Sequence, residues 1–226
     1  MTPQKNNDSK EVQILSAALN FSYFKESLSE EEIIKVMSDL KHRIFPRPFE
    51  RLSNLRTCKD LVGAEIGVAG GEHALSLLET LSIKRLYLID PYEIYDTYSE
   101  GKQHYGVDGI GLNKFKSSAE KLLSRFADRV VWVRELSTDA ANSITEELDF
   151  VYVDGNHAED FVRQDINNFF PKLSSRGVIG GHDFYNGFQR EHDGVVNAVL
   201  NSPLLRGYQM RVEVPDWWVQ VTDKIG

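Results

Sequence analysis

The stretch that decides the fold is LVGAEIGVAGGEH, residues 61–73. A short apolar run ends near an acid, Glu65, and a glycine-rich turn over residues 67–71 follows. A stretch with helical character begins at Glu72. A strand, a tight glycine turn and a helix in this order present backbone N–H groups and a helix N-terminus to a ligand at the edge of a parallel sheet. The stretch therefore predicts a site of the nucleotide-binding type, although a strand–helix turn without a ligand also fits it.

The same alternation of apolar runs and helical stretches continues downstream. Runs typical of strands lie at 62–67, 85–90, 130–136, 149–154 and 177–183. Helical patterns lie at 74–81, 112–126, 137–144, 158–173 and 194–201. This order predicts an α/β fold with a doubly wound sheet of five parallel strands. Two last strands, at 208–214 and 218–222, are close enough to pair as a hairpin around Pro215, which is an unusual ending for a dinucleotide-binding fold.

Two helical patterns precede the first core strand. One covers residues 11–24, and a capping box at 29–32 opens the other, which runs to about residue 41. We expect residues 1–60 to form an N-terminal helical cap that covers the sheet or forms the surface of a homodimer. Residues 61–226 then form the ligand-binding domain.

The composition excludes several classes of protein. Of the 226 residues, 41% are hydrophobic and 27% are charged, which suits a globular chain with a full core. The net charge of −8 argues against nonspecific binding to nucleic acid. Cys58 is the only cysteine, which excludes a disulfide framework. The sequence shows neither a signal peptide nor an apolar run of the roughly 18 residues that span a bilayer, so we expect a cytoplasmic protein.

Acids follow the predicted strands, at the edge where ligands bind in such sheets. Asp90 comes just over 20 residues after the first glycine and is placed to hold ribose hydroxyls, or else to cap a turn. Glu65 fits a buried acid that reaches a ligand through water. Asp154 and the pair His182-Asp183 should face each other at neighbouring strand ends. Such a set predicts a site for Mg²⁺ or Mn²⁺, with a hydrogen-bonded polar rim as the alternative.

His157 lies three residues beyond Asp154, within the run VYVDGNH. An imidazole titrates near neutral pH, so His157 is a candidate general base. The alternatives are that it caps the helix predicted from Ala158 or is simply solvated.

Four motifs together resemble a known family. EIGVAGGEHALSLL, LYLIDPY, DFVYVDGNH and GVIGGHDF occur in this order. They are similar to the motifs of class I S-adenosylmethionine-dependent methyltransferases, and most similar to methyltransferase family 24, a small-molecule O-methyltransferase branch. The resemblance covers roughly residues 61–196, and it implies a Rossmann-like sheet of seven strands whose seventh strand is antiparallel and inserted beside the fifth.

The resemblance also implies roles for individual residues. The cofactor would be S-adenosylmethionine, held by a set of residues from three strand ends: Glu65, Gly67, Ala69, Gly70, Gly71, Asp90, Leu136 and Ser137. Leu136 and Ser137 would lie against adenine. Asp154 would be catalytic as the first ligand of a metal, with His182 and Asp183 beside it, and His157 would be the base. Two positions depart from the family's pattern: Ala69 stands where the usual turn has its middle glycine, and His182-Asp183 stands where catechol-type enzymes have Asp-Asn as the pair that holds Mg²⁺.

The acceptor is predicted to be a small hydroxylated molecule, such as a sugar or a polyketide-type or aromatic ring. The long segment 91–111 is rich in tyrosine and glycine and resembles a lid. Tyr92, Tyr95 and Tyr185 are the candidate substrate contacts. Two other functions remain open: a nicotinamide-dependent oxidoreductase or epimerase, which lacks its third glycine because residue 72 is Glu, and a non-catalytic cofactor-binding protein.

Overall fold

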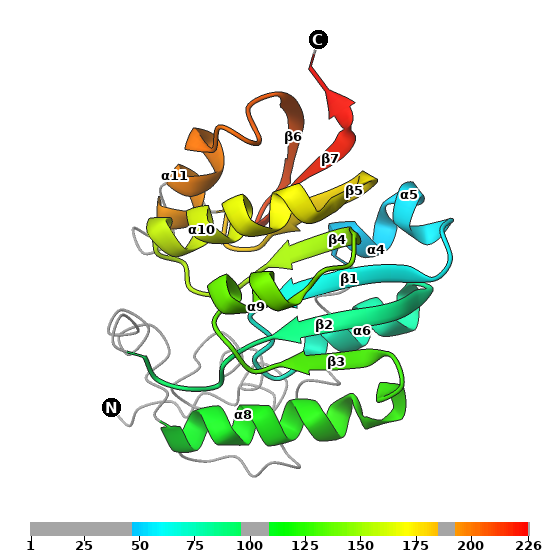
Figure 1. Ribbon diagram of the computed structural model, residues 1–226, viewed down its shortest axis with the longest axis vertical. Coiled ribbons are helices and arrows are strands. Elements are labelled where there is room, and N and C mark those ends of the chain that lie inside the picture. Colours follow the sequence, from blue (N-terminus) through cyan, green and yellow to red (C-terminus); the bar gives the residue numbers. More distant parts are fainter. Residues whose placement is uncertain (1–46, 96–108, 185–192, 226) are drawn as a thin grey trace, which may run out of the picture.

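Seven strands form one sheet in the computed structural model, which describes residues 47–95, 109–184 and 193–225 (Figure 1). The strands are β1 (Leu61–Ile66), β2 (Ile83–Ile89), β3 (Val130–Val133), β4 (Leu148–Val153), β5 (Leu173–Gly181), β6 (Tyr208–Glu213) and β7 (Asp216–Lys224). Their order is β3-β2-β1-β4-β5-β7-β6. The first five are parallel, whereas β7 is antiparallel to both β5 and β6. The predicted doubly wound sheet and its inserted C-terminal hairpin are therefore confirmed.

Helices cover both faces of this sheet. They are α4 (Pro48–Arg51), α5 (Ser53–Arg56), α6 (Glu72–Thr80), α8 (Gly109–Leu122), α9 (Ser137–Ser143), α10 (Glu159–Phe169) and α11 (Asp193–Asn201), with the 3₁₀ turns η2 (Ser124–Phe126) and η3 (Phe170–Lys172). Side chains of α4, α6 and α8 pack in one hydrophobic cluster, and those of α9, α10 and α11 pack in a second. In Figure 1, α9 and α10 lie in front of the sheet and α6 lies behind it.

The central strand β4 shows why the sequence adopts this arrangement. Its run LDFVYV is almost continuously apolar, as expected for a parallel strand buried on both faces. Phe150 and Tyr152 point into the cluster with α4 and α6, whereas Val151 and Val153 point into the cluster with α10. Burial on both sides fixes the register of β4, and with it the position of the residues that follow.

Three details differ from the sequence predictions. Because side chains alternate along a strand, the sequence predicts one of Trp217 and Trp218 in the core and the other on an exposed face. Both are buried, because β7 is an interior strand with a covered layer on each side. β3 ends at Val133 rather than at Leu136, because the chain turns there toward α9. β5 begins at Leu173 rather than at Gly177. The prediction missed this start because the residues at 174–176 are polar and partly exposed, so they show no apolar pattern.

The predicted N-terminal helices at 11–24 and 29–41 lie outside the described residues, as do most of the predicted lid and Tyr185. The described part of the predicted cap, from Arg47 on, packs directly against the sheet: Phe49 is buried, and its ring meets that of Phe150 edge to face at 6.1 Å. Among the described residues, none of the helices has the length and apolar character needed to cross a membrane.

Candidate functional site

The carboxyl ends of β1, β2, β4 and β5 meet along one edge of the sheet, because these strands are parallel neighbours (Figure 1). Glu65 lies at the end of β1, and Asp90, Asp154 and the pair His182-Asp183 follow β2, β4 and β5 directly. The sequence prediction that these side chains share one edge is consistent with this topology.

The turn after β1 passes so close to β4 that it needs glycine. Gly67 has a φ of +83°, and a Cβ there would lie 2.0 Å from the backbone oxygen of Asp154. Gly71 has a φ of +82° and is the N-cap residue of α6. Glycine adopts these angles without the steric cost that other residues carry. The turn therefore brings its backbone to the strand edge at the point where α6 begins.

Asp90 holds this turn in place. Its Oδ2 accepts hydrogen bonds from the backbone N–H groups of Val68 (3.0 Å) and Ala69 (3.2 Å), and its Oδ1 accepts one from Tyr92 (2.8 Å). Burial raises the pKa of Asp90, and these three N–H donors oppose the rise. The Tyr92 hydroxyl donates to the Ala69 carbonyl at 2.8 Å, and its ring is buried, so in this structure Tyr92 supports the turn from within.

Buried acids lie around the start of α6. Glu65 is 1% exposed, and burial, reinforced by the charges of Glu72 and Asp154, raises its pKa well above the usual range. Its Oε1 lies 3.3 Å from Nδ1 of His73, a neighbour that the sequence analysis did not single out. Burial lowers the pKa of His73, which keeps this imidazole neutral. Glu65 Oε2 and Glu72 Oε2 are buried without a hydrogen-bond partner among the described residues, so both oxygens could accept hydrogen bonds from a ligand group.

Four residues that follow β4 and β5 form a cluster beside the turn, which we call the strand-end cluster: Asp154, His157, His182 and Asp183. His157 Nε2 lies 3.0 Å from Asp183 Oδ2 and 4.0 Å from Asp154 Oδ1, and His182 Nδ1 lies 3.2 Å from the same Asp183 oxygen. Burial lowers the pKa of His157, but the hydrogen bond to Asp183 and the charges of Asp183 and Asp154 outweigh it, so the net shift is upward. The pKa of Asp183 is lowered, because its two histidine partners outweigh its burial. The His157 side chain does not cap α10: Ala158 is the N-cap residue, and its N–H donates to Asn156.

Two partners of this cluster were missed in the sequence analysis. Arg47 Nη1 donates to Tyr152 Oη (2.8 Å) and lies 3.3 Å from Asp154 Oδ2. The Tyr152 hydroxyl in turn donates to Asp216 Oδ1 at 2.5 Å. Tyr152 reads as a core residue within an apolar strand, and Arg47 lies before the first strand, so neither carries a motif signal.

The predicted metal ligands lie close together, so their arrangement can be compared with what Mg²⁺ requires. One ligand atom from each of Asp154, His182 and Asp183 lies within 4.8 Å of the others. However, Arg47 already pairs with Asp154, and one Asp183 oxygen is bonded to two imidazoles. Mg²⁺ prefers an octahedral shell of oxygen atoms. As arranged, these residues do not fit Mg²⁺.

The remaining predicted residues lie around this edge. Leu136 is the N-cap residue of α9, and the Ser137 hydroxyl donates to Asp165 of α10, inside the protein. The Tyr95 hydroxyl accepts a hydrogen bond from Asn156 at 3.2 Å, which fixes Tyr95 beside the end of β4.

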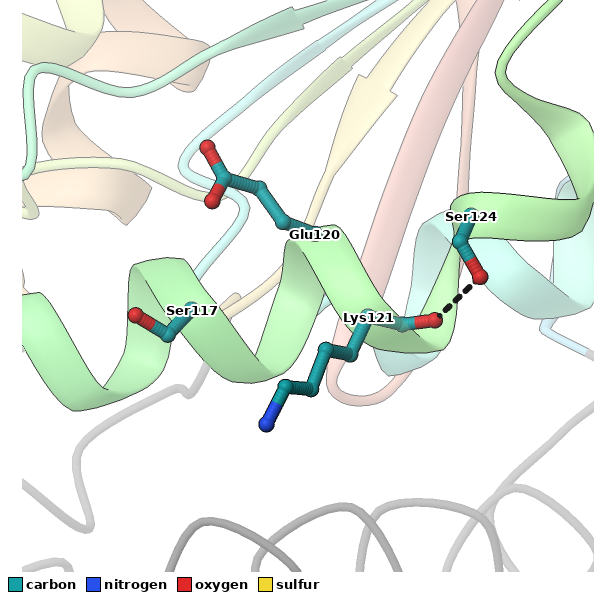
Figure 2. Close-up of a pocket in the computed structure, with 4 residues that line it drawn as sticks. All are labelled: Ser117, Glu120, Lys121 and Ser124. Atoms are coloured by element: carbon teal, nitrogen blue, oxygen red, sulfur yellow. Dashed lines mark hydrogen bonds between the residues drawn. The ribbon is translucent and has the colours of Figure 1, made fainter.

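A surface hollow elsewhere is distinct from this cluster. Figure 2 shows its lining on α8 and η2: Ser117, Glu120, Lys121 and Ser124. α8 runs antiparallel to the neighbouring strands in Figure 1, so this C-terminal half of α8 lies away from the strand ends that carry the cluster.

Several solved structures share the fold. A protein from Staphylococcus aureus named as a candidate caffeoyl-CoA O-methyltransferase has 15% identity and a TM-score of 0.55, with 93% of this chain and 98% of that chain covered. The cofactor-bound protein Rv0187 from MTB has 16% identity and a TM-score of 0.53, with 99% and 100% covered. Precorrin-6y C5,15-methyltransferase from Geobacter metallireducens has 15% identity and a TM-score of 0.51, with 82% and 85% covered. At these identities the likeness establishes the fold alone.

The family comparison is more specific than the structural one. No curated protein sequence matches the chain. A family model described as a methyltransferase domain, methyltransferase family 24, matches residues 64–184, which are more than half of the chain and include every strand end described above. Membership in a methyltransferase family implies S-adenosylmethionine as the methyl donor. The chain therefore belongs to methyltransferase family 24.

Proposed function

We propose that this methyltransferase transfers a methyl group from S-adenosylmethionine to a hydroxyl group of a small molecule. The observation that carries the proposal is the buried imidazole of His157, whose Nε2 lies 3.0 Å from Asp183 Oδ2. O-methylation requires a group that takes the proton of the hydroxyl, and His157 is chemically suited to this role.

The cofactor side of the site fits S-adenosylmethionine, which supplies an electrophilic methyl group on a positively charged sulfur. The buried oxygens of Glu65 and Glu72 that lack hydrogen-bond partners among the described residues would favour a positively charged sulfonium and amino group over a phosphate. Asp90, after β2, would hold the ribose hydroxyls, with Leu136 and Ser137 against the adenine. In a P-loop, by contrast, a lysine follows the glycines and reaches the phosphates, whereas Glu72 follows them here.

The acceptor side is derived from the residues of β4 and β5. With the His157 Nε2–H donating to Asp183, the atom that accepts the proton from the acceptor hydroxyl is Nδ1. The carboxylate of Asp183 then compensates the charge of the imidazolium. Asp154 has the more exposed carboxylate of the cluster, with a side chain 23% exposed, and would accept a hydrogen bond from a second polar group of the acceptor, which orients the acceptor. Alignment of this kind is a major source of rate in methyl transfer.

The proposal of a small acceptor rests on charge and on the tyrosine beside the site. A net charge of −8 disfavours a nucleic-acid acceptor. Tyr95, held by Asn156 beside β4, offers a ring and a hydroxyl to a sugar or an aromatic acceptor. The family match disfavours the nicotinamide-dependent alternative, whereas a non-catalytic cofactor-binding protein still predicts binding without turnover.

The test combines binding and turnover. Calorimetry should detect binding of S-adenosylhomocysteine and no binding of NADH. A panel of hydroxylated sugars, polyketides and catechols, screened by mass spectrometry for a methyl adduct, should give at least one product, and NMR should place the methyl on oxygen. Methylation at carbon or nitrogen would overturn the proposed reaction, and binding of S-adenosylhomocysteine without any turnover across the panel would favour the non-catalytic alternative.

A further inference from the structure

Arg47 is built rigidly into the edge of the strand-end cluster. Its backbone N–H donates to the carboxylate of Glu50, which also accepts a hydrogen bond from Ser76 on α6. The next residue, Pro48, is the first of α4, where a proline fits because that position needs no N–H donor. Phe49 is buried with its ring edge to face against Tyr152, at 5.3 Å between centroids. The backbone that carries the guanidinium is therefore fixed to both α6 and β4.

The guanidinium gives this cluster a positive charge. Its side chain is 11% exposed, and its Nη1 contacts both Asp154 Oδ2 (3.3 Å) and Tyr152 Oη (2.8 Å). Through the Tyr152 hydroxyl, which donates to Asp216, the same charge faces a second carboxylate. Arginine stays protonated at every physiological pH, so this compensation is permanent.

A divalent metal bound to Asp154 would compete with this guanidinium, which lies 3.3 Å from Asp154 Oδ2. The ion would have to displace Arg47 from Asp154 or share the carboxylate with a like charge a few ångströms away. Removal of one partner from a buried ion pair leaves the other charge uncompensated, which is unfavourable. In addition, one oxygen of the third predicted ligand residue, Asp183, already accepts from His157 and His182.

We infer that Arg47 is the resident cation of this site, which positions Asp154 and excludes a divalent metal from it. Arg47 is then a positioning residue: it acts on the acceptor through Asp154, and the reaction does not depend on Mg²⁺. The inference rests on the proposed function only in taking this cluster as the reaction site. Metal binding can be measured without donor or acceptor, so failure of the inference and failure of the proposed function are distinguishable.

The test is a titration of the full-length protein with Mn²⁺, in which electron paramagnetic resonance reports free ion. The wild-type protein and the Asp154→Asn variant should give the same titration curve, because Asp154 holds no metal. Arg47→Gln should create a site that binds Mn²⁺ about tenfold or more tightly, since a positive charge near the ion is removed. The double variant Arg47→Gln with Asp154→Asn should lose that gain.

Two controls separate this effect from general damage. Arg51→Gln removes a guanidinium from α4, the short helix that follows Arg47, where it pairs with Glu213 on an exposed surface, and this variant should behave like the wild type. Arg47→Lys retains the charge and should also exclude Mn²⁺. Binding of Mn²⁺ to the wild-type protein that weakens in Asp154→Asn would overturn the inference, and this comparison decides the matter even where Arg47→Gln does not fold. A folded Arg47→Gln protein that gains no affinity would overturn it as well.

Discussion

Asp165 makes the stability of this protein depend on pH in a way that can be calculated. It lies on α10, is 2% exposed, and accepts a hydrogen bond from the Ser137 hydroxyl. Burial raises its pKa from 3.8 to about 7, and the bond from Ser137 opposes the rise only in part. The folded state therefore favours the protonated carboxyl, whereas the unfolded chain is ionised above about pH 4.

The magnitude follows from the difference between the two pKa values. A shift of roughly three units corresponds to roughly 4 kcal/mol between the protonation states. The contribution of Asp165 to the free energy of unfolding is largest below about pH 4. It falls as the pH rises toward 7, and it is constant above that. Between about pH 5 and pH 8 the wild-type protein should lose roughly 3 kcal/mol of unfolding free energy from this group.

The perturbation that isolates the effect is Asp165→Asn. Asparagine keeps an acceptor for the Ser137 hydroxyl and cannot ionise, so the variant should lack this part of the pH dependence. Urea unfolding, followed by circular dichroism at several values between about pH 5 and pH 8, gives the free energies for both proteins. The difference in the free energy of unfolding between the variant and the wild type should rise by roughly 3 kcal/mol in favour of the variant from about pH 5 to pH 8.

The control is Asp160→Asn on the same helix. The Asp160 side chain is 71% exposed and pairs with Arg163 on the surface, so its replacement should shift stability equally at every pH. If Asp165→Asn and the wild type lose stability in parallel from about pH 5 to pH 8, Asp165 is ionised throughout and the reasoning from burial is refuted.

Three further predictions concern the strand-end site. His157→Gln should lower kcat by about 10²-fold to 10⁴-fold, the usual contribution of a general base, and leave the affinity for S-adenosylhomocysteine unchanged; a steady-state assay with an unchanged rate would remove His157 from the mechanism. Gly67→Ala should lower the free energy of unfolding by roughly 3 kcal/mol or more in urea denaturation. The reason is that its methyl group would lie 2.0 Å from a backbone oxygen at a φ of +83°, whereas at Gly207 a Cβ meets nothing within 4 Å and alanine should be tolerated. Asp90→Ala should weaken S-adenosylhomocysteine binding about 10-fold to 100-fold in calorimetry, because the proposed contact with the ribose is lost and the N–H groups of Val68 and Ala69 in the turn lose their acceptor; full affinity in this variant would refute a ribose-binding role.

The fold could be predicted from the sequence because its parallel strands are buried on both faces. β4 reads as an apolar run, and a chemically distinctive residue, Asp154, follows it directly. The signal fails where a strand leaves the covered core: the start of β5, Leu173 to Arg176, is partly exposed and polar, and it carries no apolar pattern. It also fails for Trp217 and Trp218, since two adjacent tryptophans in the last strand do not by themselves show that both faces of β7 are covered.

The site could be predicted only where its residues follow strands. Arg47 reaches Asp154 across 107 positions of sequence, from a segment whose only local signal is a proline that begins α4. The hydroxyl of Tyr152 joins Arg47 to Asp216, yet in the sequence it is one more bulky residue of an apolar strand. These contacts depend on which strands become neighbours, which is tertiary information.

The pair His182-Asp183 shows how backbone conformation completes the site. In a regular strand, successive side chains point to opposite faces, so the side chains of His182 and Asp183 would point away from each other. Asp183 has a φ of +58°, a left-handed conformation that aspartate tolerates better than most residues but at some cost. This turn at the end of β5 lets one Asp183 oxygen meet His157 at 3.0 Å and His182 at 3.2 Å. The strained residue therefore lies where the chain departs from the side-chain alternation of a strand and brings a carboxylate and two imidazoles together.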